Sequence, residues 1–137
     1  MTNIENFGYL SIDIDTLILK NENDMNKFFE LIKVKEKIYG MNLLYRASRD
    51  GLNYLNIVNK INNKSNLIFL YLTGNNRIFG AFIKAKLANI NMNGEDKIFK
   101  DENAFAFSLN LNKKYKILIP EYAILIDKIN FIRIGNS

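Results

Sequence analysis

The densest group of polar side chains in an otherwise apolar part of the chain lies at residues 45–51. It places the guanidinium groups of Arg46 and Arg49 close in sequence to the Ser48 hydroxyl and the Asp50 carboxylate. Guanidinium groups bind phosphate and carboxylate through paired hydrogen bonds. These four residues are therefore a candidate contact for an anion, a phosphopeptide or a protein partner.

A structural role for the same residues is the favoured interpretation. Within a strand, alternation would turn Arg46 and Ser48 away from Tyr45. Asp50 would cap a following helix, because Asp is a preferred N-cap residue, and it would pair with Arg49. A buried arginine–carboxylate arrangement would fix this junction, although it need not add net stability.

The complete absence of cysteine and histidine limits the available chemistry. It excludes disulfides, thiol nucleophiles, imidazole acid–base catalysis and zinc sites built from these residues. There is also no phosphate-binding glycine loop, GxSxG motif, HExxH motif or EF-hand loop. We therefore expect no catalytic residue, no metal ligand and no cofactor, and a protein that is not an enzyme. Three carboxylate pairs are expected to be exposed rather than tuned for acid–base chemistry: Asp13/Asp15, Glu95/Asp96 and Asp101/Glu102.

A stripe of apolar residues, Phe105, Phe107 and Leu109, alternates with smaller side chains. Such a stripe could stack nucleic-acid bases. Aromatic residues at strand period more often form one face of a hydrophobic core, and this is the interpretation we favour.

The net charge of +5 raises the question of a nucleic acid or an anionic membrane as partner. The lysines are dispersed along the chain, however, and the arginines are scattered at Arg46, Arg49, Arg77 and Arg133. Because a nucleic-acid interface needs charge clustered on one face, we expect a solvated surface and no nucleic-acid partner. No signal peptide and no apolar run of about 18 residues is visible, so a cytoplasmic location is expected.

The residues before and after the polar group predict helices around it. Met25, Phe28, Phe29 and Ile32 follow helical spacing and indicate a helix over 23–38, capped by Asn23 or Asp24 and ended by Gly40. Residues 43–48 alternate as a strand would, and 52–62 repeats apolar residues on adjacent turns as a helix would.

The rest of the chain predicts short strands joined by hairpin turns. A continuous apolar run at 67–73 indicates a buried strand, and Gly74-Asn75-Asn76 indicates a tight turn after it. Residues 84–102 are expected to form a loop. Further strands are expected at 77–83, 104–109, 115–119, 122–126 and 131–134. Because no alternation of parallel strands and helices follows the second helix, a single α+β domain over 1–137 with antiparallel sheets is predicted.

Three motifs in this order resemble the TLDc domain family. Residues 41–51, which end in LLYRASRDG, resemble the strand that leads into a helix at the start of the family pattern. Residues 77–82 resemble its IFGGF strand, and residues 103–109 its NAFLFSL strand. The resemblance covers about residues 15–127.

What the resemblance implies is an antiparallel β-sandwich core flanked by two helices. It also implies roles in oxidation resistance and, for several members, direct binding to the vacuolar-type proton-pumping ATPase. The expected function is a non-catalytic protein-binding module on such an assembly, peripheral to a membrane only through its partner. The alternative is a structural subunit of another large complex. The motif residues expected to be structural are Tyr45, Gly51, Phe79, Gly80, Phe82, Phe105 and Phe107.

The chain departs from the family pattern at three places. Residues 55–59 replace a Phe-His pair and a cysteine, and without cysteine the chain cannot resist oxidants through its own thiols. Gly80-Ala81 replaces a double glycine, so a close backbone approach there is expected to be relaxed. The family continues through a glycine-rich stretch beyond the residues matched here. We therefore expect a domain that is C-terminally truncated, minimal or completed by a partner, with an open sheet edge that favours β-augmentation.

Overall fold

The computed structural model describes residues 2–5, 16–34 and 40–135. Its helices are α1 (Glu22–Leu31), α2 (Ala47–Asp50), α3 (Tyr54–Ile61) and a 3-10 helix, η1 (Pro120–Tyr122). Its strands are β1 (Thr2–Glu5), β2 (Gly40–Leu43), β3 (Leu67–Leu72), β4 (Ile78–Ile83), β5 (Lys97–Phe99), β6 (Phe105–Ser108), β7 (Lys113–Lys116), β8 (Ile124–Asp127) and β9 (Phe131–Ile134).

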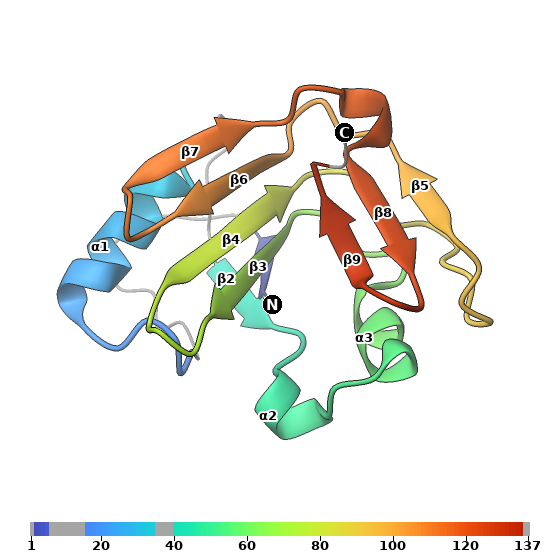
Figure 1. The fold of residues 1–137 in the computed structure, drawn as a ribbon, viewed down its shortest axis with the longest axis horizontal. Helices are drawn as coiled ribbons and strands as arrows, with labels where there is room; N and C mark the ends of the chain where they lie inside the picture. Colours follow the sequence, from blue (N-terminus) through green and yellow to red (C-terminus); the bar gives the residue numbers. More distant parts are fainter. Residues whose placement is uncertain (1, 6–15, 35–39, 136–137) are drawn as a thin grey trace.

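The strands form two antiparallel sheets of unequal width (Figure 1). The larger sheet has six strands in the order β2-β1-β3-β4-β6-β7, and the smaller has three in the order β5-β8-β9. Helix α1 lies at one end of the molecule, and the small sheet with α3 lies at the other (Figure 1). The architecture confirms the predicted α+β class with antiparallel sheets and flanking helices, to which it adds the four-residue helix α2.

Helix α1 covers one face of the large sheet. The Asn21 side chain accepts a 2.8 Å hydrogen bond from the Asp24 backbone N–H and so caps the helix. The cap predicted at Asn23 or Asp24 is therefore wrong. Phe28, which is almost fully buried, packs edge-to-face against Phe107 of β6, with the ring centroids 6.1 Å apart. This first core also contains Leu19, Leu31, Ile32, Ile68, Ile78, Phe82, Phe105 and Leu109.

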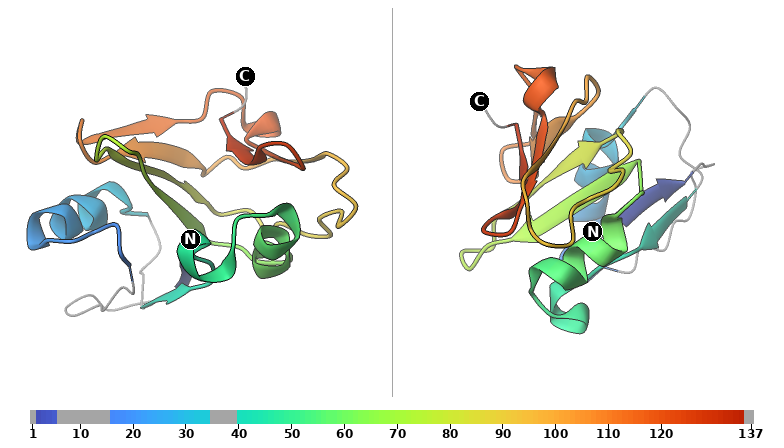
Figure 2. Two further views of the ribbon diagram at one scale, coloured as in Figure 1. Left: turned by 60° about the horizontal axis from the view of Figure 1, so that its bottom comes forward. Right: turned by 90° about the vertical axis from the view of Figure 1, so that its right-hand side faces the viewer.

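Helix α3 and the small sheet cover part of the opposite face. The Asn53 side chain accepts a hydrogen bond of 2.9 Å from the Asn56 backbone N–H, so Asn53 caps α3 in place of the predicted Asp50. Val58 and Ile61 of α3 are buried completely. They belong to a second core with residues of both sheets, among them Leu67, Phe69, Ile83, Ile124 and Ile126. The left view of Figure 2 shows α1 and α3 on opposite sides of the molecule.

Several element boundaries differ from those predicted. Helix α1 ends at Leu31 rather than at residue 38, and Gly40 opens β2 instead of ending a helix; residues 35–39 lie outside the described part. Strand β5 lies within the segment 84–102 that was predicted to be a loop. Strand β1 was not predicted, since its four residues carry only a short pattern.

The strand predicted over 43–48 is wrong for most of its length. Strand β2 ends at Leu43, and the chain turns into α2 at Ala47. The Asp50 carboxylate accepts a 2.8 Å hydrogen bond from the Arg46 backbone N–H, which competes with strand pairing at this point. Arg46 keeps an extended backbone as predicted, whereas Ser48 lies in α2 and not in a strand.

Strand β7 is made of the residues KKYK and pairs with β6. It begins at Lys113, two residues before the strand predicted at 115–119, and Asn112 in the preceding turn has a positive φ of 50°. The Lys114 Nζ lies 3.9 Å from the centre of the Phe105 ring and donates a 2.9 Å hydrogen bond to the Lys33 carbonyl oxygen. Lys114 thus ties the edge of the large sheet to the segment that follows α1.

No helix in the described part of the chain has the length and the apolar character needed to cross a membrane.

Candidate functional site

The polar group at residues 45–51 forms a compact turn around α2. The buried Tyr45 side chain donates a hydrogen bond of 2.6 Å from its hydroxyl to the Gly51 carbonyl oxygen. Gly51 has a φ of 84°, a conformation that glycine adopts without strain, and its N–H donates to the Ala47 carbonyl oxygen. Tyr45 and Gly51 are therefore bonded within this turn.

Asp50 is the centre of this turn. Its carboxylate accepts two hydrogen bonds of 2.8 Å from the Arg49 guanidinium and one of 2.8 Å from the Arg46 backbone N–H. The hydrogen bonds from the Arg49 side chain are the largest influence on the pKa of Asp50, and the bond from the Arg46 backbone N–H is the second. Together they hold this pKa well below its usual range. The predicted pairing of Asp50 with Arg49 is confirmed, and it occupies the carboxylate with contacts inside the turn.

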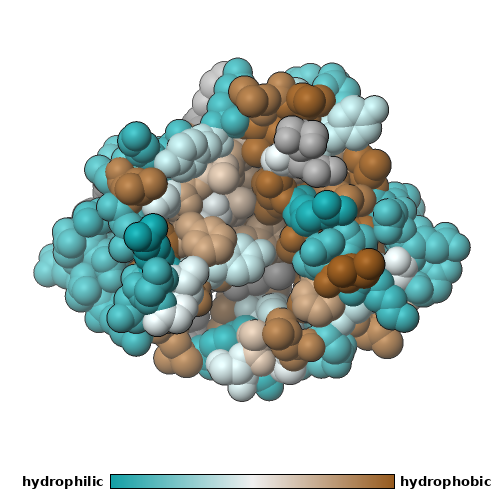
Figure 3. Space-filling view, viewed as in Figure 1, coloured by the Kyte–Doolittle hydropathy of each residue, from teal (hydrophilic) through white to brown (hydrophobic). Residues whose placement is uncertain are grey.

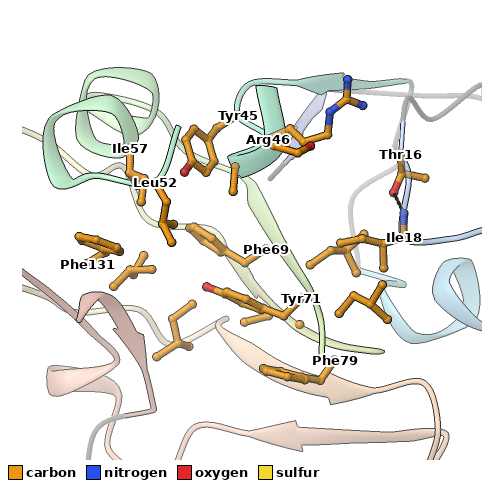
Figure 4. Close-up of a pocket in the computed structure, with 18 of the residues that line it drawn as sticks. Thr16, Ile18, Tyr45, Arg46, Leu52, Ile57, Phe69, Tyr71, Phe79 and Phe131 are labelled. Atoms are coloured by element: carbon orange, nitrogen blue, oxygen red, sulfur yellow. Dashed lines mark hydrogen bonds between the residues drawn. The ribbon is translucent and has the colours of Figure 1, made fainter. Parts of the chain in front are cut away.

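The structure separates the four candidate binding residues rather than joining them in one anion site. Ser48 is exposed on α2. The Arg46 side chain extends away from Phe69 and Tyr71, as Figure 4 shows. Arg49 is bonded to Asp50 and reaches the Leu44 carbonyl oxygen at 3.4 Å. The contacts favour the structural interpretation of these residues.

The motif residues of the large sheet divide between its two faces. Phe82, Phe105 and Phe107 are buried in the core beneath α1, which confirms that the aromatic stripe belongs to the core. Phe79 points to the opposite face and is 43% exposed. Its structural role is therefore only partial.

Gly80 is the position of closest backbone approach in the large sheet. A Cβ atom on Gly80 would lie 2.1 Å from the Phe69 carbonyl oxygen and 2.6 Å from the Phe107 ring. Real Cβ atoms essentially never approach so closely. The expectation that this approach is relaxed is wrong for Gly80, whereas the neighbouring Ala81 is accommodated in a buried position.

Two carboxylates are buried in the ranges that the structure describes, and one of them was predicted to be exposed. Asp101 is 4% exposed, and its carboxylate accepts backbone hydrogen bonds from Lys84, Ala85 and Asn103 at 2.7–2.9 Å. It holds together the loop after β4 and the segment before β6. The Glu102 side chain is exposed as predicted, and Glu95 and Asp96 are exposed as well.

The second buried carboxylate, Asp127, organises the turn between β8 and β9. It accepts hydrogen bonds from the backbone N–H groups of Ile129 and Asn130 and from the Arg133 guanidinium. The Asn130 N–H is the largest influence that lowers the pKa of Asp127. Both buried carboxylates are thus bonded to backbone N–H groups that they hold in place, Asp127 within its own turn and Asp101 across two segments. The predicted pair Asp13/Asp15 lies outside the described residues.

Among the residues that the structure describes, no three His, Cys, Asp or Glu side chains are grouped so that they could hold a metal ion.

One feature that the sequence did not predict is an apolar groove of about 730 Å³. It lies on the face of the large sheet opposite α1, between β3 and β4 on one side and α2 and β9 on the other. Figure 3 shows the hollow on this face, and Figure 4 shows the side chains around it. We call it the apolar groove and define it by Tyr45, Leu52, Phe69, Tyr71, Phe79 and Phe131.

One wall of the apolar groove is an aromatic pair. The rings of Tyr71 and Phe79 are stacked, with centroids 5.1 Å apart and planes inclined by 15°. Tyr71 is 39% exposed, so both rings of the pair are open to solvent. The only sequence signal for this wall was the presence of aromatic residues in strands, which also describes an ordinary core.

The comparisons with known proteins give one match. Residues 14–137 match the model of a family described as the TLDc domain. No curated protein and no solved structure matches the chain.

Proposed function

Since the chain belongs to the TLDc domain family, we propose that it is a non-catalytic protein-binding module that docks on a large protein assembly. TLDc domains are generally protein-interaction modules. The observation that supports this function here is the apolar groove, where aromatic side chains that would ordinarily be buried stand open to solvent. Contiguous exposed apolar surface of this kind commonly marks an interaction site.

The contacts of the polar residues also support binding over catalysis. Asp50 and Asp127 accept hydrogen bonds from backbone N–H groups of their own turns, and Asp101 accepts them from the loop after β4. A general acid or base must reach a substrate and have a pKa suited to proton transfer. Three carboxylates held by backbone N–H groups serve the fold instead.

The assembly that we propose is the vacuolar-type proton-pumping ATPase, because several members of the family bind this pump directly. A structural subunit of another large complex is the alternative, in which the same fold would be a permanent building block. The two functions differ in their partner and not in the chemistry of the surface.

The test is quantitative mass spectrometry of proteins that co-purify with the tagged chain from its native cells, with the tag alone as control. Enrichment of subunits of the vacuolar-type ATPase is the expected result. Enrichment of another assembly at fixed stoichiometry would replace the pump with the structural alternative. A chain that brings down no protein above the tag control would contradict the function as a binding module.

A further inference from the structure

The two sheets differ in width, and this leaves half of one sheet face uncovered. On the face opposite α1, Leu67 and Ile83 pair across β3 and β4 and are buried beneath the small sheet and α3. Tyr71 and Phe79 pair further along the same two strands, on the same face, and are exposed. The small sheet therefore covers one end of this face, and no other described segment covers the end with the aromatic pair.

The small sheet ends at the apolar groove with an open strand edge. Strand β9 is the last strand in the order β5-β8-β9, so one of its sides has no strand partner among the described residues. The N–H of Gly135, which directly follows β9, donates to the carbonyl oxygen of Ala123, which directly precedes β8. Because hydrogen-bonding direction alternates along an antiparallel strand, the backbone N–H and C=O of Ile134 face the open side. Ile132 and Ile134 also line the apolar groove.

The β7 edge of the large sheet carries charges that oppose the addition of another strand, and the β9 edge of the small sheet carries fewer. Strand β7 carries Lys113, Lys114 and Lys116, and lysines on an edge strand oppose the addition of another strand. Strand β9 reads FIRI, with one charged residue. Its Arg133 is bonded to Asp127. Of these two edges, β9 is thus the one less protected by charge against an additional strand.

The charge around the apolar groove selects the kind of segment that fits. Arg46 is the only charged residue among the described residues that line it, and no carboxylate does. Lys113 lies in the same cross-strand row as Phe79, and Arg77, two residues before Phe79, shares its face by alternation. Neither Lys113 nor Arg77 forms an ion pair within the described residues. The net charge of +5 also opposes a second copy of the chain as the occupant.

We propose that the apolar groove receives an extended, acidic segment of a partner protein, which adds a strand to the open edge of β9. Alternate side chains of this segment are apolar and pack on Tyr71 and Phe79, while its carboxylates face the cations at the rim. The segment runs along the four residues of β9, a span of about 13 Å, and pairs at Ile134, because the Ile132 N–H already donates to the Asn130 carbonyl oxygen. This inference rests on the proposed function as a binding module and names its surface and the chemistry of its partner.

The first test uses a synthetic probe and the full chain. The probe is a fluorescein-labelled peptide of nine residues that alternates valine and glutamate, and its binding is measured by fluorescence anisotropy. We expect saturable binding, which weakens on the order of tenfold when lysine replaces glutamate in the peptide. Methylation of the backbone nitrogens on one edge of the valine–glutamate peptide removes the donors for strand pairing. We expect this change to lower the affinity of the chain for the peptide by the same order.

The second test locates the binding on the protein. Tyr71→Ala removes half of the aromatic wall, and Ile134→Pro removes the outward N–H of β9. Each variant is expected to bind the valine–glutamate peptide more weakly than the unaltered chain does, on the order of tenfold. Tyr122→Ala is the matched control, because Tyr122 is 53% exposed and lies outside the groove. Circular dichroism establishes that each variant is folded.

Three results would overturn the proposal. They are equal binding of the glutamate and lysine peptides, no saturable binding by the unaltered chain, and equal binding by the unaltered chain and by folded Tyr71→Ala and Ile134→Pro. A dimer in sedimentation velocity that Ile134→Pro converts to a monomer would assign the groove to a second copy and also overturn it.

Co-purification with Ile134→Pro separates this proposal from the proposed function. If the unaltered chain and the variant bring down the same partner equally, the binding module stands and the groove is not its docking surface. If the unaltered chain brings down no partner, the proposed function fails whatever the peptide does.

Discussion

The Tyr45 hydroxyl donates a hydrogen bond of 2.6 Å to the Gly51 carbonyl oxygen and closes the loop that contains α2. The same loop is held from the other side by the Asn56 side chain, which donates to the Asp50 carbonyl oxygen at 2.7 Å. The family motif therefore encodes a turn whose polar groups are bonded to one another. This turn sets one wall of the apolar groove, because Tyr45 and Leu52 both line it.

The first prediction concerns that hydrogen bond. Tyr45→Phe removes only the hydroxyl and leaves the Gly51 carbonyl oxygen without its donor. We expect the free energy of unfolding to fall by about 1 kcal/mol, the typical net contribution of one hydrogen bond. Urea unfolding followed by circular dichroism measures it. Tyr122→Phe is the matched control and should change nothing, since Tyr122 is exposed; an equal loss in both variants would show that the bond does not stabilise the turn.

The second prediction concerns the close approach at Gly80. Gly80→Ala forces a Cβ atom against the Phe69 carbonyl oxygen and the Phe107 ring, which are backbone and buried core. We expect the free energy of unfolding to fall by about 3 kcal/mol or more, at the upper end of what overpacking costs. Gly74→Ala is the matched control, because no atom lies within 4 Å of a Cβ there. Thermal melting of both variants should show a lower midpoint for Gly80→Ala alone, and equal midpoints would contradict the close approach.

The parts of the fold that the sequence predicted well are those fixed by local pattern. The apolar run at 67–73 and the Gly-Asn-Asn turn after it predict the β3–β4 hairpin because both signals lie within a few residues. Phe105 and Phe107 alternate, and this alternation places them together on the core face. Helix α3 follows for the same reason, with an error at its first residues because two polar residues, Asp50 and Asn53, compete for the cap.

The parts that the sequence did not predict depend on contacts between distant residues. Asp101 looks like any surface carboxylate in sequence, and it is buried because the loop after β4 brings two backbone N–H groups to it. Tyr71 and Phe79 look like core aromatics, and they are exposed because the small sheet reaches only the other end of their strands. No local sequence pattern shows how far the small sheet, which ends at β9, extends over the large sheet.

The third prediction concerns Asp101. Asp101→Asn keeps the size of the side chain but removes a charge and one acceptor from a carboxylate that accepts three backbone N–H groups. We expect a loss of about 2 kcal/mol in the free energy of unfolding, since hydrogen bonds to charged groups are among the stronger ones. Glu102→Gln, next in the chain and exposed, is the control and should change stability by less than about 0.5 kcal/mol. If the two variants are equally stable, Asp101 does not hold the loop as its contacts indicate.

The fourth prediction concerns the pH dependence that Asp127 gives to stability. The Asn130 backbone N–H, together with Ile129 and Arg133, lowers the pKa of Asp127 in the folded chain. In the unfolded chain the pKa of an aspartate is about 3.9. Because the folded value is the lower of the two, Asp127 contributes its stability in full above about pH 5 and loses it as the pH falls through the folded value.

Asp127→Asn removes this titration, since an amide does not ionise. The unaltered chain should exceed the variant in free energy of unfolding by an amount that is constant between about pH 5 and pH 8 and shrinks below about pH 4. Urea unfolding of both proteins across this range measures the difference. Glu95→Gln makes the same change of charge at an exposed position and should show no such convergence. A difference between the unaltered chain and Asp127→Asn that stays constant down to pH 3 would mean that the bonds to Asp127 do not favour its ionised form.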